Sequence, residues 1–386
     1  MDTRYQNQID PVSSGEMPIV DPDRLVDIEQ KHRRVAEFLE LHGYDALLLT
    51  KPGNFSWFTS GGNCARSGSH EPTAALFITP EARVVVTDSA NSARLFDREL
   101  PGLGFQLKER AWYEPRHLLV QDLCRSRKVA ADIETRGVED ISLHLRGMRL
   151  PLSLVECERL RELGRDVAHA VEATARSFSR GQTEAEVAGE LAHRLIKHRI
   201  VPERLQVFAD LQALRYPHWS YGTDRVERSC VIAAMGSRQG LHAGAARSIC
   251  FGKAPDDVTD AHHRATLVQA AGMYFCRSDW ELFEIWDRIV RIYEKYGEPD
   301  AWLRAEQAEI VGYDACEVPI VPKSEFRLET RMPVYWHPSV GPAITGDTML
   351  VSEDEFELLT PMSDWPKLRI EIKGTSVDRP AILCRD

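Results

Sequence analysis

The stretch Ala233–Phe251, which reads AAMGSRQGLHAGAARSICF, decides the fold of this 386-residue chain. It closes a longer segment, Val207–Phe251, that is mostly of extended character. The segment therefore predicts β-strands. Small residues stand at Ala233 and Gly244, and neither side chain can bind a metal or move a proton.

The composition is that of an ordinary globular protein with room for two domains. Hydrophobic residues make up 43% of the chain and charged residues 28%, and this length allows sizeable cores. A net charge of -11 argues against nucleic-acid binding as the main activity. No apolar run approaches the ~18–20 residues of a membrane span, and the N-terminus resembles no secretory signal. We predict no nucleic-acid partner and no membrane partner.

The chain has eight cysteines that are scattered without the CxxC spacing of zinc or redox motifs. Without a secretory signal, such cysteines are typical of reduced thiols in the cytoplasm. The cysteine pattern therefore predicts a cytoplasmic protein without a structural zinc site.

The first part of the chain predicts a flexible arm followed by an α/β domain. Residues 1–24 are polar and contain several Pro, Gly and Asp residues, which is typical of a loose terminus. An amphipathic helix is predicted at Leu25–Leu41, ended by Gly43, and a turn at Lys51–Asn54. Strands are predicted at residues 45–50, 74–78, 82–86 and 128–132. These elements define a domain over residues 25–150.

The second part predicts an α+β domain over residues 151–386. A long amphipathic helix is expected at Ser153–Ala175, and Thr183 with Glu186 forms a capping box that opens a second helix. Further helices are expected at about residues 257–272 and 280–296. Helices grouped around antiparallel strands fit an α+β sandwich better than alternating strands and helices.

Five motifs in order resemble the creatinase and Xaa-Pro aminopeptidase family (M24), the "pita-bread" metallohydrolases. They are Arg34–Gly62, Pro217-His218, the strand pair at 233–251, Gly312-Tyr313-Asp314 and Gly346–Val351. The resemblance covers nearly the whole chain after residue 25. It implies an α/β N-terminal domain followed by an α+β pita-bread domain. It also implies a homodimer, because members of this family are commonly homodimers.

The family binds two metal ions through two Asp, one His and two Glu, and these ions generate a hydroxide. The resemblance assigns the corresponding positions to Ala233, Gly244, Glu309, His337 and Gly346. Three of the five have no ligand side chain, and the other two have changed residue type. We therefore expect no metal at this site and no other cofactor.

The resemblance also indicates how such a site would work. Creatinase cleaves a C–N bond without metal through a histidine, and Pro217-His218 resembles the segment that carries it. A neutral imidazole can take up or release a proton near pH 7. We predict a metal-independent hydrolase or lyase that cleaves a C–N bond of a small non-protein substrate, with His218, His337 and Glu309 as catalytic residues. The predicted substrate-binding residues are Arg247, which would pair with a carboxylate, and His242, Cys316, Glu317, Trp219 and Trp336.

Two other functions stay open at this point. One is a peptidase-like hydrolase with a single metal ion. Its ligands would be His218, His242, Glu309 and His337, if these side chains met in one cavity. Pita-bread domains without ligands also exist as non-catalytic binding modules, and a fold alone does not fix the function.

Overall fold

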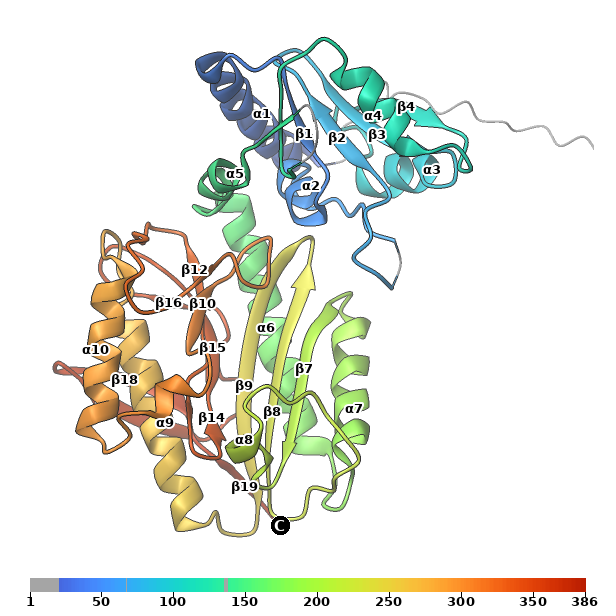
Figure 1. Ribbon diagram of the computed structural model, residues 1–386. Helices are drawn as coiled ribbons and strands as arrows, with labels where there is room; N and C mark the ends of the chain where they lie inside the picture. Colours follow the sequence, from blue (N-terminus) through green and yellow to red (C-terminus); the bar gives the residue numbers. More distant parts are fainter. Residues whose placement is uncertain (1–20, 67, 135–137) are drawn as a thin grey trace, which may run out of the picture. The chain divides into compact units, whose positions relative to one another are not determined.

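The computed structural model describes residues 21–66, 68–134 and 138–386. The chain divides into two compact units, Met1–Arg149 and Leu150–Asp386, each with its own sheet (Figure 1). Residues 1–20 of the expected arm lie outside the described residues. Residues 22–24 already belong to the first helix, α1 (Pro22–His42), because Asp21 caps it by accepting a hydrogen bond from the Arg24 amide at 3.0 Å.

The first unit contains a six-stranded sheet in the order β4-β3-β2-β1-β5-β6. Only β2 is antiparallel to its neighbours among these described strands. The strands predicted from the sequence are confirmed. The bounds are β1 Ala46–Leu49, β2 Ala75–Ile78, β3 Arg83–Asp88, β4 Gln106–Arg110, β5 Val129–Ala131 and β6 Val138–Asp140.

The helices of this unit include one that the sequence did not predict. The turn expected at Lys51–Asn54 is the start of α2 (Pro52–Phe58). The buried carboxylate of Asp132 accepts hydrogen bonds from the Thr50 amide, the Lys51 amide and the Asn54 side chain at 2.8–2.9 Å. It thereby fixes the chain where α2 begins. The remaining helices are α3 Ser92–Arg94, the π-helix Leu95–Glu99, α4 Arg116–Cys124 and α5 Ser142–Arg149.

The second unit is built on a nine-stranded sheet in its described residues, with the main order β11-β10-β12-β15-β9-β8-β7. In addition, β16 pairs with β15 and β19 with β9. The bounds are β7 Val201–Ala209, β8 Ser229–Arg238, β9 Leu241–Phe251, β10 Ala308–Ile310, β11 Val318–Pro319, β12 Pro333–Trp336, β15 Gly346–Leu350, β16 Glu357–Leu358 and β19 Leu383–Arg385. Two small ribbons pair β13 Ser339–Val340 with β14 Ala343–Ile344, and β17 Lys367–Ile372 with β18 Thr375–Pro380.

The predicted strand pair is the β8–β9 hairpin at the centre of this sheet. Its two-residue turn consists of Gln239 and Gly240, both with positive φ (55° and 82°), as in the tight turns that match the twist of a hairpin. The turn sets the register in which Ala233 faces Ala246 and Met235 faces Gly244.

Helices cover this sheet, and the expected α+β architecture is confirmed. The predicted capping box of Thr183 with Glu186 is present at the start of α7 (Glu184–Lys197), and Ser153 with Glu156 forms another at the start of α6 (Leu154–Ser177). Figure 1 shows α6 running along β8 and β9. The other helices are α8 Gln212–Arg215, α9 Asp256–Phe275, α10 Leu282–Lys295 and the 3₁₀ turn Ala301–Leu303. None of the described helices is long and apolar enough to cross a membrane.

Candidate active site

The candidate site lies on one face of the nine-stranded sheet. Residues that face each other in neighbouring strands lie on the same face, and so do residues two apart along a strand. The hairpin register therefore places Ala233, Met235, Gly244 and Ala246 on one face, and Gly346 of β15 joins them because it pairs with Ala246. Four of these five residues are Gly or Ala, so the face offers almost no side chain of its own.

Tyr335 of β12 fills the space above these small residues. A Cβ atom added to Gly244 would lie 2.7–2.9 Å from three atoms at the end of the Tyr335 ring. A Cβ atom added to Gly346 would lie 2.7 Å from the Tyr335 hydroxyl oxygen. The ring is buried and forms a small apolar cluster with Met235 and Val311. Tyr335 thus takes the room of a side chain at both glycine positions.

The dinuclear metal site that the resemblance implies does not fit these residues. Ala233, Gly244 and Gly346 have no side-chain donor atom for a metal, and the Tyr335 ring leaves no room for a larger residue beside either glycine. Within residues 21–66, 68–134 and 138–386, no three His, Cys, Asp or Glu side chains gather as a set that could hold a metal ion. The single-metal set of two or three His and Glu309 is therefore not assembled there either.

Glu309 and His337 are brought together at the edge of this face. The Nε2 atom of His337 lies 2.5 Å from Oε2 of Glu309, and the other carboxylate oxygen accepts a hydrogen bond from Nη1 of Arg204 at 2.7 Å. The exposed fractions of the three side chains are 4% for Glu309, 15% for His337 and 42% for Arg204. A buried carboxylate thus joins an imidazole to a guanidinium that is partly open to solvent.

The electrostatics of this group favour an ionised carboxylate. Burial on its own would raise the pKa of Glu309, but the charges and hydrogen bonds of His337 and Arg204 outweigh it and hold the pKa below its ordinary value. An ionised Glu309 accepts the Nε2–H of His337, which selects that tautomer. Nδ1 of His337 forms no hydrogen bond within the described residues and is then the nitrogen that can accept a proton. The Tyr335 ring stacks on the imidazole, with centroids 4.7 Å apart.

Substituting Glu309 tests the electrostatics through protein stability. The variant Glu309→Gln is expected to be less stable than the wild type by about 1–2 kcal/mol at pH 7, because it loses hydrogen bonds to a charged group. The pKa of Glu309 is lower in the folded protein than in the unfolded chain. The stabilisation by Glu309 is therefore complete above the ordinary carboxyl pKa, and it is lost as the pH falls through the pKa that Glu309 has in the folded protein. Urea unfolding at pH 5.5, 4.5 and 3.5 should show the difference shrinking only below about pH 4. A difference that is constant over this range would contradict the ionised assignment.

His218 pairs with a carboxylate other than Glu309. It is 61% exposed, and its Nε2 atom lies 2.6 Å from the exposed carboxylate of Glu306. It follows the short helix α8 in a surface loop. The structure therefore gives His218 a different carboxylate partner from the one that His337 has, and the predicted meeting of His218, Glu309 and His337 is not found.

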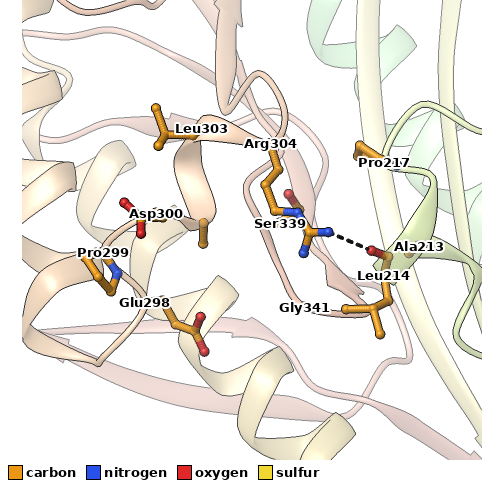
Figure 2. Close-up of a pocket in the computed structure, with 11 residues that line it drawn as sticks. Ala213, Leu214, Pro217, Glu298, Pro299, Asp300, Leu303, Arg304, Ser339 and Gly341 are labelled. Atoms are coloured by element: carbon orange, nitrogen blue, oxygen red, sulfur yellow. Dashed lines mark hydrogen bonds between the residues drawn. The ribbon is translucent and has the colours of Figure 1, made fainter.

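A cavity of about 860 Å³ lies beside this loop (Figure 2). Leu214 of α8 and Pro217 of the loop line it on one side, and Asp300 and Arg304 line it from the segment after α10. Nη2 of Arg304 donates a hydrogen bond to the Leu214 carbonyl oxygen at 3.3 Å. Its lining residues do not include Glu309 or His337.

Two predicted substrate-binding residues are core residues instead. The guanidinium of Arg247 has no solvent exposure and pairs with Glu172 at 3.1 Å and Asp347 at 2.9 Å, so it cannot reach a substrate carboxylate. Trp336 is fully buried. Its ring lies against Gly272 of α9, where a Cβ atom would come within 2.7 Å of it. Both predictions are corrected to structural roles.

Two other predicted residues, Glu317 and Trp219, hydrogen-bond within the protein, and a third, Cys316, has a raised thiol pKa. The carboxylate of Glu317 accepts hydrogen bonds from the Tyr313 and Asp314 amides at 3.0 and 3.2 Å and so shapes the turn after β10. Burial raises the pKa of the Cys316 thiol to about 11, which argues against a nucleophilic thiolate at neutral pH. The Trp219 indole donates to Glu184 at 2.7 Å.

His242 lies two residues before Gly244 on the same face of β9. Its Nδ1 atom is 3.0 Å from the Gly312 carbonyl oxygen, and its Nε2 atom is 3.9 Å from a carboxylate oxygen of Glu203. Burial lowers the pKa of His242, so the imidazole is neutral at physiological pH. It is on the correct face for a substrate contact, and it does not join the Glu309–His337 pair.

Arg204 and Tyr335 are site residues that the sequence analysis missed. Arg204 follows an irregularity in the β7–β8 pairing and lies opposite Met235, and no local pattern signals this position. Tyr335 had a signal in the sequence, because an aromatic residue stands two positions before His337 while the facing ligand positions are glycines.

Comparison with known proteins identifies the family. The sequence profile of metallopeptidase family M24 matches residues 158–360, more than half of the chain, so this chain belongs to family M24. The structure has the pita-bread fold of this family with an N-terminal α/β domain. No curated protein sequence matches the chain.

Solved structures share the fold at low sequence identity. A prolidase from Pyrococcus horikoshii OT3 has a TM-score of 0.73 at 16% identity, covering 86% of this chain and 99% of its own. The dipeptidase PepE from Mycobacterium ulcerans has a TM-score of 0.74 at 15% identity, covering 93% and 99%. An X-Pro aminopeptidase from Thermotoga maritima MSB8 has a TM-score of 0.71 at 17% identity, covering 92% and 99%. These similarities establish the fold and leave the reaction open.

Proposed function

We propose that this protein is a metal-independent hydrolase or lyase that cleaves a C–N bond of a small non-protein substrate. The observation that carries the proposal is the 2.5 Å contact between His337 and a buried carboxylate of Glu309. It lies beside a face on which Tyr335 has taken the place of ligand side chains. A histidine–carboxylate pair of this kind is suited to transferring protons.

The hydrolytic reaction can be written with this pair alone. Nδ1 of His337 takes a proton from a water molecule, and the water oxygen forms a bond to the carbon of the C–N bond. The imidazolium then gives the proton to the leaving nitrogen, and the C–N bond breaks. The hydroxyl remains on carbon and the hydrogen on nitrogen. Glu309 orients the imidazole and stabilises its charged form between the two steps.

The position of Arg204 indicates that the substrate carries an anionic group. Its Nη1 atom is held by Glu309, while Nε and Nη2 form no hydrogen bond within the described residues. The side chain is 42% exposed, so this edge of the guanidinium can bind a carboxylate. Arg204 thus takes the substrate role that the sequence analysis assigned to Arg247.

The proposal includes a cytoplasmic homodimer that binds neither nucleic acid nor membranes. The eight cysteines are all free thiols, six of them at least partly buried, which fits a reducing compartment. Light scattering of the purified protein is the direct measurement of the dimer.

The test is an amine-release assay in the presence of EDTA. The substrates are N-acetyl and N-carbamoyl amino acids, with Xaa-Pro dipeptides as the comparison. We expect turnover that EDTA does not remove, and a fall in kcat/KM of about 10²–10⁴-fold in His337→Gln. The matched control His193→Gln changes an exposed histidine of α7 and should be as active as the wild type. Activity that EDTA abolishes and one divalent metal restores would overturn the proposal.

The second candidate is a non-catalytic binding protein. The observation that favours it is the buried Tyr335 ring, which closes much of the face that carries ligands in the resemblance. This candidate predicts that none of the compounds is turned over and that His337→Gln folds and behaves like the wild type in cells.

A further inference from the structure

We propose that the Tyr335 hydroxyl donates a hydrogen bond to the carbonyl oxygen of the substrate during the reaction. It would act as the electrophile that a metal ion supplies in metallohydrolases. This inference rests on the proposed function and narrows its substrate class to compounds with a carbonyl group attached to the scissile nitrogen, such as amides and ureides.

The position of the phenol is the first argument. Its ring end lies directly over Gly244, and its oxygen lies over Gly346, close to Ala246. Two of these three are positions that the resemblance assigns to metal ligands. The hydroxyl therefore stands where those ligands would project.

The freedom of the hydroxyl is the second argument. It forms no hydrogen bond with any of the described residues. Its donor hydrogen is therefore not used by another group in the described part of the chain.

The neighbours of Tyr335 are the third argument. Tyr335 faces Glu309 across the β10–β12 pair and lies two residues before His337, so all three side chains lie on one face of the sheet. The ring stacks on the imidazole with centroids 4.7 Å apart. The proton carrier and the hydrogen-bond donor thus lie side by side on the same face.

The protonation state of the Tyr335 phenol suits a hydrogen-bond donor. An ordinary phenol is neutral below about pH 10, and burial, together with the charge of Glu309, raises the pKa of Tyr335 further. A fixed neutral donor in a site shielded from water stabilises a developing oxyanion strongly, and removing one such donor typically costs about 10²–10³-fold in kcat.

The test is Tyr335→Phe, which keeps the ring over Gly244 and the stack on His337 and removes only the oxygen. With the N-acetyl or N-carbamoyl amino acid that is turned over in EDTA, we expect kcat to fall about 10²–10³-fold. KM and the thermal unfolding midpoint should stay near their wild-type values. The control Tyr221→Phe removes the hydroxyl of an exposed tyrosine and should leave kcat unchanged.

The outcomes separate this inference from the proposed function. If His337→Gln loses activity and Tyr335→Phe keeps the wild-type kcat, the role of the hydroxyl is wrong and the proposed function stands. If neither variant loses activity, both are wrong. A rise in KM with unchanged kcat would make Tyr335 a substrate-binding residue only and would also overturn the inference.

Discussion

Substituting Arg247 by Gln is expected to lower the free energy of unfolding by about 3–5 kcal/mol. Arg247, Glu172 and Asp347 are all fully buried, and the guanidinium bonds to both carboxylates. The variant leaves buried carboxylates without their shared counter-ion, although Arg379 also contacts Asp347. Removing one partner of such a group is costly, because the remaining charge keeps its desolvation penalty.

Urea unfolding followed by circular dichroism measures this effect. The control Arg327→Gln removes an arginine that is 58% exposed and pairs with Glu281 at the surface, so its effect should be below about 1 kcal/mol. Equal stability of the two variants would contradict the structural role of Arg247 and reopen its assignment to the substrate.

The parity of strand positions explains the two corrected residues. Side chains alternate between the two faces of a strand. Gly244 and Ala246 lie on the site face, so Arg247, an odd number of positions from Gly244, points to the other face, where α6 supplies Glu172. Trp336 lies between Tyr335 and His337 and therefore points away from them. The sequence contained this information once the strand register was known.

Local signals explain why much of the fold was predictable. The capping boxes at Thr183 and Ser153 act over three residues, and the hairpin turn at Gln239-Gly240 sets its own register. The start of α2 was missed because its hydrogen bonds come from Asp132, about 80 residues further along the chain. A hydrogen-bond partner that is distant in the sequence cannot be predicted from a local sequence pattern.

The candidate site was predicted only in part for the same reason. Glu309 and His337 were identified because the resemblance assigns both to ligand positions of the family, and the structure joins them. Arg204 lies in a strand about 100 residues before Glu309, next to an irregularity in the strand pairing. No turn residue or hydrophobic periodicity in the sequence predicts that irregularity. The motif that contained His218 fixed its place in the chain and not its direction, so its surface partner Glu306 could not be foreseen.

Restoring a carboxylate at the family position, by Gly244→Asp, is expected to destabilise the protein by more than about 3 kcal/mol. The new side chain would collide with the Tyr335 ring, since a Cβ atom alone comes within 2.7 Å of it, and overpacking costs about 1–3 kcal/mol. It would also bury a charge without a partner, which adds a desolvation cost. The matched control Gly189→Asp places the same residue on an exposed glycine of α7, where a Cβ atom meets nothing within 4 Å.

Removing the ring at the same time decides whether Tyr335 is what excludes the carboxylate. Tyr335→Ala on its own destabilises the protein by leaving a cavity, but in that background Gly244→Asp has room for its side chain. We expect the cost of Gly244→Asp to fall by about 1–3 kcal/mol, as a coupling energy in a double-mutant cycle of urea unfolding. Additive costs would mean that the face rejects a carboxylate for another reason. A coupled result would show that the tyrosine and the glycines form one unit, in which an aromatic ring has taken the volume of the ligands.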